Sequence, residues 1–282
     1  MLIPLMLAVL GAGSPAAAVQ DTVVPVDRGT RLHVDNHRGE VAVRTWARDA
    51  VRVRSGSLRD RQRVTVARGG SVLRVRAESH RGPRDAELDI TVPAWMDLRI
   101  EGNQLDVNVA GVAGEVSIET IGGDVVVEGG AGLVAVRTIE GEIVIRGAQG
   151  RIEAASVNDD VTLEDVGGDL QVETTNGDIT LHGIRSTSAR AGSVNGDISY
   201  RGTLRDNGRY RFTTHNGDLT LAVPRETNAA VTVSTFHGEF ESDFPVRLTG
   251  VTRDRQFNFT IGTGSGRLEL ESFNGDIRLR RP

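Results

Sequence analysis

Eight acidic residues recur along this chain at nearly constant spacing, and seven of them directly follow a glycine, whereas Asp160 follows Asp159. They are Asp124, Glu142, Asp160, Asp178, Asp197, Asp218, Glu239 and Asp276. The first four lie 18 residues apart, and the next two intervals are 19 and 21 residues. If each interval is one turn of a coil, the carboxylates form a column. Like charges in such a column repel one another unless they reach water or share cations, and calcium favours clustered carboxylate oxygens.

This acidic column has two interpretations. Asp and Asn side chains hydrogen-bond nearby backbone groups at tight corners, so we interpret the column as turn-forming and solubilising. The calcium-binding Gly-Gly-x-Gly-x-Asp repeats have a residue between the last glycine and the Asp, whereas here glycine directly precedes the acid. We therefore predict no metal site, no cofactor and no catalytic residue. The alternative is a cation ladder formed by Asp124, Glu142, Asp160, Asp178, Asp197 and Asp218.

A second column consists of a hydroxyl residue four positions before each acid. Its members are Thr120, Thr138, Ser156, Thr174, Ser193, Thr214, Thr235 and Ser272. Thr is common in strands because of its β-branched side chain. We predict that the hydroxyls satisfy backbone groups at the corners. The alternative is an exposed flat array that meets a partner.

Other potentially reactive side chains do not form a convincing site. His33, Asp35 and His37 alternate on one predicted strand and project to one face, as a metal site with two histidines and one carboxylate requires. No fourth ligand is foreseeable, so we interpret them as solvent-facing polar residues. The chain has no Cys, no Lys and no Gly-x-Ser-x-Gly motif, which removes the common nucleophile arrangements.

The columns belong to a repeated unit that reads apolar-x-apolar-x-[ST]-x-[NG]-G-[DE]-apolar-x-apolar. A fixed period of this length is typical of stacked repeats. The unit predicts an all-β fold, a β-solenoid with about 18–21 residues per coil. Asn-Gly also favours type I′ hairpins, so an antiparallel meander is the competing arrangement. We prefer the solenoid because the Thr, Gly and acid recur at one phase in every unit.

Three segments are expected along the chain. Residues 1–18 resemble a secretory signal peptide with a small-residue cleavage site, and an uncleaved N-terminal anchor is the alternative. Residues 19–95 alternate apolar and polar residues and predict a small all-β N-terminal subdomain. Residues 96–282 predict the β-solenoid repeat domain.

The last part of the repeat is less regular. Glu239 and Asp276 are 37 residues apart, about two coils, so the segment from Gln256 to Ile261 is expected to be an irregular coil. The final residues, Arg278 to Pro282, place charge and proline on what we expect to be an exposed terminal strand. Such residues discourage edge-to-edge pairing.

Composition limits the classes of partner. The net charge is −5, all 33 basic residues are Arg, and they are interspersed with 38 Asp and Glu residues. Nucleic-acid binders carry basic patches, so we expect no nucleic-acid partner. Apart from the first residues, no apolar run approaches the ~20 residues of a membrane span, so we expect no span in the mature chain.

Three ordered motifs carry a family resemblance. They are Leu32-x-Val34-x-Asn36-x-x-Gly39-Glu40-Val41-x-Val43-x-Thr45-Trp46, then Leu88-x-Ile90-x-Val92-Pro93, then tandem [ST]-x-[NG]-G-[DE]-[IV]-x-[LV] units. In this order, over roughly residues 30 to 282, the chain resembles the bacterial β-strand-repeat family of unknown function often labelled "putative adhesin". The resemblance implies a β-solenoid envelope or surface protein without established catalytic residues.

These observations predict an exported, non-enzymatic β-repeat protein of the envelope or surface, adhesin-like or structural in role. Its location is periplasmic, cell-surface or extracellular, and its partner is an envelope or surface ligand, protein or glycan. Its oligomeric state is left open. The alternative is a polysaccharide-active β-helix enzyme with a calcium-dependent carboxylate site, and a third possibility is a structural spacer.

Overall fold

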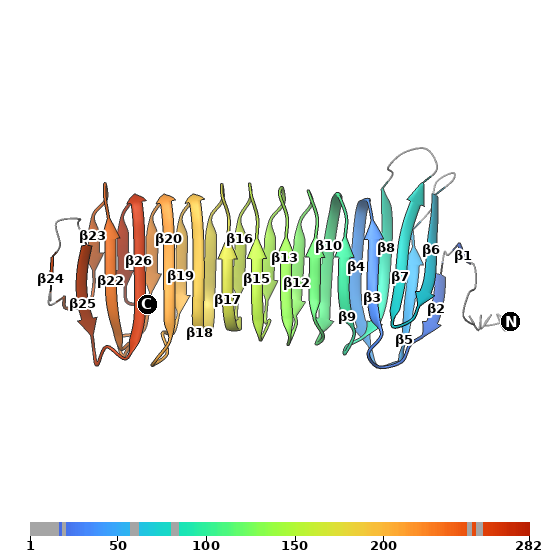
Figure 1. The fold of residues 1–282 in the computed structure, drawn as a ribbon, viewed down its shortest axis with the longest axis horizontal. Helices are drawn as coiled ribbons and strands as arrows, with labels where there is room; N and C mark the ends of the chain where they lie inside the picture. Colours follow the sequence, from blue (N-terminus) through green and yellow to red (C-terminus); the bar gives the residue numbers. More distant parts are fainter. Residues whose placement is uncertain (1–16, 19–20, 57–61, 80–84, 247–249, 252–255) are drawn as a thin grey trace.

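The computed structural model describes residues 17–18, 21–56, 62–79, 85–246, 250–251 and 256–282. Residues 1–16 of the predicted leader lie outside this part of the chain, and the leader stays a prediction. The described residues form strands joined by turns, without an α-helix, and the strands stack into a long, straight rod (Figure 1). The all-β solenoid prediction is confirmed.

Each coil of the rod contributes one strand to a sheet, here called sheet A, and the next strand to an opposite sheet, sheet B. Successive coils pair in parallel and in register. In sheet A, for example, Val116 pairs with Val134, which pairs with Ile152. Parallel pairing between successive units excludes the antiparallel meander in this region. Equivalent side chains of successive coils therefore form columns about 4.8 Å apart along the rod.

The middle of the rod follows the chain one coil after another. Its strands, first in sheet A and then in sheet B, are β9 (Asp97–Glu101) and β10 (Gln104–Val112), β11 (Val116–Glu119) and β12 (Val125–Gly129), β13 (Leu133–Arg137) and β14 (Ile143–Arg146), β15 (Arg151–Ala155) and β16 (Val161–Glu164), β17 (Gly167–Glu173) and the first part of β18 (Ile179–Asn195), the second part of β18 and β19 (Ile198–Gly202), then β20 (Arg209–Asn216) and β21 (Leu219–Ala222).

At the N-terminal end the first coil of the rod lies inside the stack, and the chain then turns back on itself. β3 (Arg31–Asn36) and β4 (Arg38–Trp46) pair on one side with β9 and β10, and on the other side with β7 (Val72–Ser79) and β8 (Ala86–Pro93). Antiparallel strands cover the outer edge: β6 (Gln62–Gly69) and β1 (Ala17–Ala18) in sheet A, β5 (Ala50–Ser55) and β2 (Asp21–Pro25) in sheet B.

The C-terminal end differs from two sequence expectations. The final coil, β26 (Gly266–Asn274) and β27 (Ile277–Arg280), lies between β20–β21 and the earlier coil β22 (Ala229–Thr235) and β23 (Phe240–Ser242). The prediction of an exposed terminal strand is therefore wrong, because β27 is paired on both sides. Gln256–Ile261 is not a coil either. It forms β25, an antiparallel cap on β22, and pairs with β24 (Gly250–Val251).

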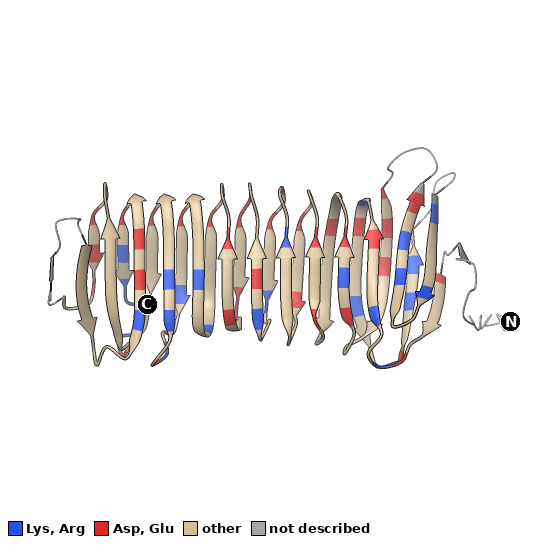
Figure 2. Ribbon diagram, viewed as in Figure 1, with Lys and Arg blue, Asp and Glu red and all other residues tan. Residues whose placement is uncertain are grey.

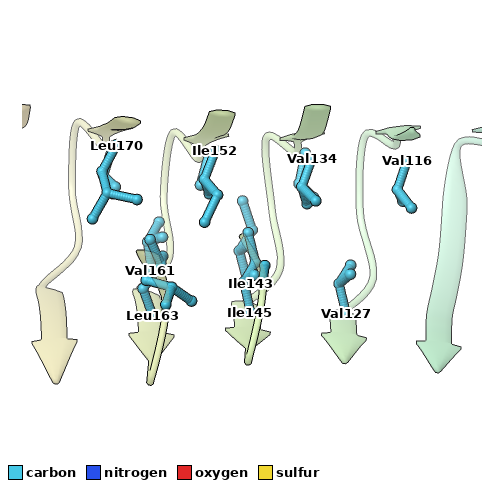
Figure 3. Packing of buried hydrophobic residues seen from close by; sticks show 14 of the residues in the cluster. Val116, Val127, Val134, Ile143, Ile145, Ile152, Val161, Leu163 and Leu170 are labelled. Atoms are coloured by element: carbon cyan, nitrogen blue, oxygen red, sulfur yellow. The ribbon is translucent and has the colours of Figure 1, made fainter. Parts of the chain in front are cut away.

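The core is a narrow layer between the two sheets. Alternate residues of each strand point inward, so Val116, Val134, Ile152 and Leu170 of sheet A face Ile143 and Val161 of sheet B (Figure 3). All six are buried. Each contributes to the stability of its own coil and of its neighbours, which is the energetic pattern of repeat proteins. The domain boundary predicted at residues 95 and 96 stays a prediction; both sheets continue across it through β3–β9 and β4–β10 pairing.

Candidate interaction surface

One corner of the rod, between each sheet A strand and the following sheet B strand, holds every sequence column named above. We call it the Thr-Gly-acid corner; in one coil it comprises residues 120–124. The hydroxyl column lies inside it and is buried throughout. Thr120 donates to the Gly122 carbonyl oxygen at 2.7 Å, and Thr214 donates to that of Gly196 at 2.9 Å. The prediction that these hydroxyls satisfy backbone groups is confirmed, so they are not an exposed array.

Glycine precedes the acid in seven of the eight coils because neighbouring coils approach closely there. In the remaining coil Asp159 takes this position, and its carboxylate accepts the Gly141 N–H at 2.7 Å. A Cβ on Gly196 would lie 1.9 Å from the Gly177 carbonyl oxygen, and one on Gly217 would lie 2.1 Å from that of Gly196. These two oxygens also accept the Ser193 and Thr214 hydroxyls, at 3.1 and 2.9 Å. The glycine column therefore sets the contact distance between coils at this corner.

The acidic column forms a ladder of hydrogen bonds between coils. The carboxylate of one acid accepts the backbone N–H of the acid in the next coil: Asp178 accepts from Asp197 at 2.8 Å, and Asp197 accepts from Asp218 at 2.8 Å. The same bond links Asp106 to Asp124, Asp124 to Glu142, Asp160 to Asp178, Asp218 to Asp276, and Asp276 to Glu239. This is the backbone-bonding role that the sequence interpretation gave to the column.

A third ladder runs beside the acids. The side-chain amide of Asn195 donates to Asn176 at 2.8 Å and accepts from Asn216 at 2.7 Å, and the series extends to Asn158 and Asn274. Each amide is exposed, and Asn176, Asn195 and Asn216 use both of their polar groups along the rod. The corner is therefore tied together by three parallel sets of bonds, from hydroxyls, amides and carboxylates.

One acid has a shifted pKa. Burial raises the pKa of Asp218, but the Asp276 N–H and the Arg278 guanidinium, at 2.6 Å, outweigh it and leave the pKa below its ordinary value of 3.8. Within the described residues no three His, Asp or Glu side chains are grouped to hold a metal ion. The cation ladder stays a prediction that calcium titration must decide.

The histidine candidates are held by separate partners. His33 Nε2 lies 2.8 Å from the Glu101 carboxylate, whereas Asp35 accepts from the Arg76 guanidinium at 2.9 Å. His37 lies at the start of the corner, where its carbonyl oxygen accepts the N–H groups of Asn103 and Gln104. The structure thus places the three in one region without joining them as ligands of a common centre.

A fourth column of the corner was missed by the sequence reasoning. It is the residue directly after each hydroxyl, and all eight members are exposed. In spatial order we call them the corner ridge: Ile121, Ile139, Val157, Thr175, Val194, His215, Phe273 and Phe236. Of the seven large hydrophobic side chains that are exposed in the described residues, six belong to this ridge and the seventh is Val23. The signal was present in the repeat, in the position written as x.

The corner ridge ends in an aromatic stack. The Phe273 ring has two aromatic neighbours. The His215 ring stacks on it with centroids 4.8 Å apart, and the Phe236 ring contacts it with centroids 5.0 Å apart. Phe236 is 49% exposed and Ile121, at the opposite end, is also 49% exposed. The ridge therefore changes from branched aliphatic side chains to aromatic ones along the rod.

The outer face of sheet A adjoins the ridge and contains an open hollow of about 460 Å³. The hollow follows the outward column Ala155, Glu173, Gly192 and Thr213, in which small residues lie on both sides of Glu173. Arg190 and Arg211 line it together with Glu173. Arg211 also pairs with Glu269 and Glu271 at 3.5 and 3.3 Å, so the hollow lies at the edge of a charge network.

Acidic and basic side chains recur along the whole rod (Figure 2). Many are paired across neighbouring strands, as Arg146 is with Glu164 at 2.6 Å. Exposed pairs of this kind contribute little stability each, in the range of about 0–1 kcal/mol, so their main effect is on the surface potential. In the part of the chain that the structure describes, no helix is both long enough and apolar enough for a membrane crossing.

Comparisons with known proteins support this architecture. The family model described as Toastrack DUF4097 matches residues 29–280. A crystal structure of a "putative adhesin" from Parabacteroides distasonis is similar at a TM-score of 0.53 and 9% identity, covering 92% of this chain and 96% of that chain. A "putative cell adhesion protein" from Clostridium sporogenes matches at a TM-score of 0.27 and 9% identity, with 93% and 99% covered. A search among curated proteins gave no match.

The identity to the Parabacteroides structure is so low that it bears on the fold alone. The family model covers nearly all of the rod, from the turn before β3 to the end of β27. The chain therefore belongs to the Toastrack DUF4097 family of β-repeat proteins.

Proposed function

We propose that this chain is an exported, non-enzymatic β-repeat protein that binds an envelope or surface ligand, protein or glycan, on the outer face of sheet A. The observation that carries the proposal is the hollow lined by Arg190, Arg211 and Glu173. Small residues flank Glu173 here in one outward column of sheet A. Guanidinium groups beside small residues give a ligand both charge-assisted hydrogen bonds and close access to the sheet.

The shape of the site supports binding and gives no support to a catalytic role. The hollow is open along the rod, and its charged groups are held by a flat, paired sheet. The acids of the Thr-Gly-acid corner bond the backbone of the next coil, as Asp178 does with the Asp197 N–H. The printed name of the Parabacteroides structure, "putative adhesin", agrees with an interaction role. The polysaccharide-active alternative draws no support from the described residues.

The test is binding of the full chain to isolated bacterial envelope material. We expect Arg190→Gln with Arg211→Gln to weaken binding by at least tenfold, because both guanidinium groups at the hollow are lost. Arg201→Gln is the matched control, since Arg201 is exposed at the equivalent outward position of sheet B.

Equal loss in both variants would indicate a general charge effect and contradict the proposed site. No binding by the unaltered chain would favour the structural spacer. Cleavage of an envelope polymer by the purified protein would favour the enzyme.

A further inference from the structure

The corner ridge borders the site proposed above, because its members Thr175 and Val194 also line the hollow, whereas the other six members do not. Its exposed apolar surface needs its own explanation. Soluble proteins bury large apolar side chains where they can, and a contiguous exposed patch of several hundred Å² marks an interaction surface. At 37–49% exposure each, the six large apolar side chains present roughly 500 Å² of accessible surface. We propose that the corner ridge is the contact surface for a second copy of this chain, packed antiparallel along the rod.

The spacing of the ridge is the first argument. Its side chains project from coils about 4.8 Å apart, and they lie in one line over eight coils. A second copy carries the same ridge with the same pitch, so the two can match at every coil. A partner without this pitch would fit a few positions and lose register at the others.

The change of side-chain size along the ridge selects the antiparallel orientation. In that orientation Phe273 of one copy faces Ile139 of the other, and Phe236 faces Ile121. At the centre, Thr175 faces Val194, so the smallest pair lies where the two-fold axis passes. Large side chains then pack against branched aliphatic ones along the whole contact. A parallel arrangement would put Phe on Phe at one end and Val on Val elsewhere, which leaves the spacing between the rods uneven.

The area agrees with a weak, specific dimer. Covering the ridge on both copies removes roughly 1,000 Å² of surface from water, which is the lower limit expected of a specific interface. A membrane surface fits less well, because the acidic column runs beside the ridge and repels the anionic lipid headgroups common in bacterial membranes. The two acidic columns also approach each other in the dimer, so raised salt should tighten it by screening them.

The first experiment measures sedimentation of the full chain from 1 to 200 µM. We expect a reversible monomer–dimer equilibrium that strengthens with salt. Val194→Glu and Ile139→Glu should each raise the dimer dissociation constant at least tenfold. Val23→Glu is the matched control, because Val23 is equally exposed, at 46%, but lies on β2 at the outer end of the rod.

Thermal unfolding of each variant shows that the fold is intact, and Val194→Ser provides a milder change of the same position. A monomer at every concentration, or a dimer that Val194→Glu leaves unchanged, would overturn the proposal. So would equal weakening by Val23→Glu. Binding of the monomer to phospholipid vesicles, lost in Val194→Glu, would overturn it in favour of the membrane.

The second experiment tests the orientation and uses the absence of cysteine from the chain. We mix the Ile139→Cys and Phe273→Cys proteins under mild oxidation. The antiparallel dimer predicts a disulfide mainly between the two variants. Disulfides mainly within Ile139→Cys alone would show a parallel contact and contradict the proposed packing.

Discussion

The middle of the rod and its two ends use the same two-stranded coil in a different chain order. From β9 to β21 each coil follows the previous one in the sequence, and each coil is formed by 18 to 21 consecutive residues. At the N-terminal end the coil β3–β4 lies inside the stack, between β9–β10 and the later strands β7–β8, and at the C-terminal end the last coil lies between two earlier ones. Antiparallel strands then cover both sheets at the N-terminal end and sheet A at the C-terminal end.

The difference shows what a solenoid needs besides its repeat. Each interior strand has partners on both sides, but an outermost strand exposes unpaired N–H and C=O groups that would recruit other chains. An antiparallel cap covers that edge and cannot itself template another parallel coil. The repeat can be regular only where no edge must be covered, so irregular spacing marks the ends of the rod.

Removal of the final coil should have the largest effect. Deleting residues 266–282 leaves β20 and β22 without their shared partner and removes the buried Leu268, Leu270, Ile277 and Leu279. We expect hydrogen-exchange protection to be lost from β20 to β25, while β11 to β16 stay protected because repeat stability depends on nearest neighbours. Removing Pro282 alone is the control. Uniform loss along the rod would contradict this local behaviour.

Substitution of two glycines of one coil should distinguish the close contact between coils at the corner from the open outer surface of sheet A. Gly196→Ala places a methyl group 1.9 Å from a carbonyl oxygen and should cost about 3 kcal/mol. Gly192→Ala meets its nearest atom at 3.9 Å and should stabilise the strand by about 0.5 kcal/mol. Chemical denaturation of both variants measures the difference. Equal effects would mean that neighbouring coils are not held at this distance.

The carboxylate ladder predicts a smaller loss in the middle of the rod. Asp197→Ala removes the acceptor of the Asp218 N–H and should cost about 1 kcal/mol. Glu142→Ala should change the free energy of unfolding by only a few tenths of a kcal/mol, because in the described residues the Glu142 carboxylate accepts no such bond. Urea unfolding compares the two. A large loss in both would point to the net charge of the column instead.

The contact between Asp218 and Arg278 of the final coil also predicts that stability depends on pH. The pKa of Asp218 in the folded protein lies below 3.8, so the unfolded chain binds more protons in this range. The stabilising effect is complete above pH about 4 and is lost as pH falls through the folded pKa. Asp218→Asn should therefore flatten the decline of the thermal midpoint below pH 4. An unchanged decline would show that other acids dominate it.

Calcium should have the smallest effect. One oxygen of each Asp in the ladder already accepts a backbone N–H, and no three-ligand group occurs among the described residues. We expect millimolar calcium to leave the thermal midpoint within about one degree, since a ligand of the native state alone would raise it. A rise of several degrees would establish the cation ladder.

The repeat made most of the fold predictable from the sequence. The phase of hydroxyl, Gly and acid identified the coils within residues 96–282. The position of the final coil was not predictable. A repeat unit specifies how a coil packs, but every coil presents nearly the same edges, so it does not specify between which neighbours the unit lies.

The corner was predicted in part. Hydrogen bonding by the hydroxyls and acids followed from residue type alone. The corner ridge was overlooked because Ile121, Val194 and Phe273 look like ordinary strand residues until the glycine after them fixes the turn and leaves them outside. The hollow depends on which small residues become neighbours across sheet A, which only the register shows.

The position of the final coil between two earlier coils has a mechanical consequence. In a stack that ends with its last coil outermost, tension on the C-terminus would peel coils away one at a time, each held by a single row of hydrogen bonds. Here tension on Pro282 is borne by β27, which is bonded to β21 on one side and to β23 on the other. Two rows must yield together, so this end of the rod should resist pulling better than a simple spiral of the same length.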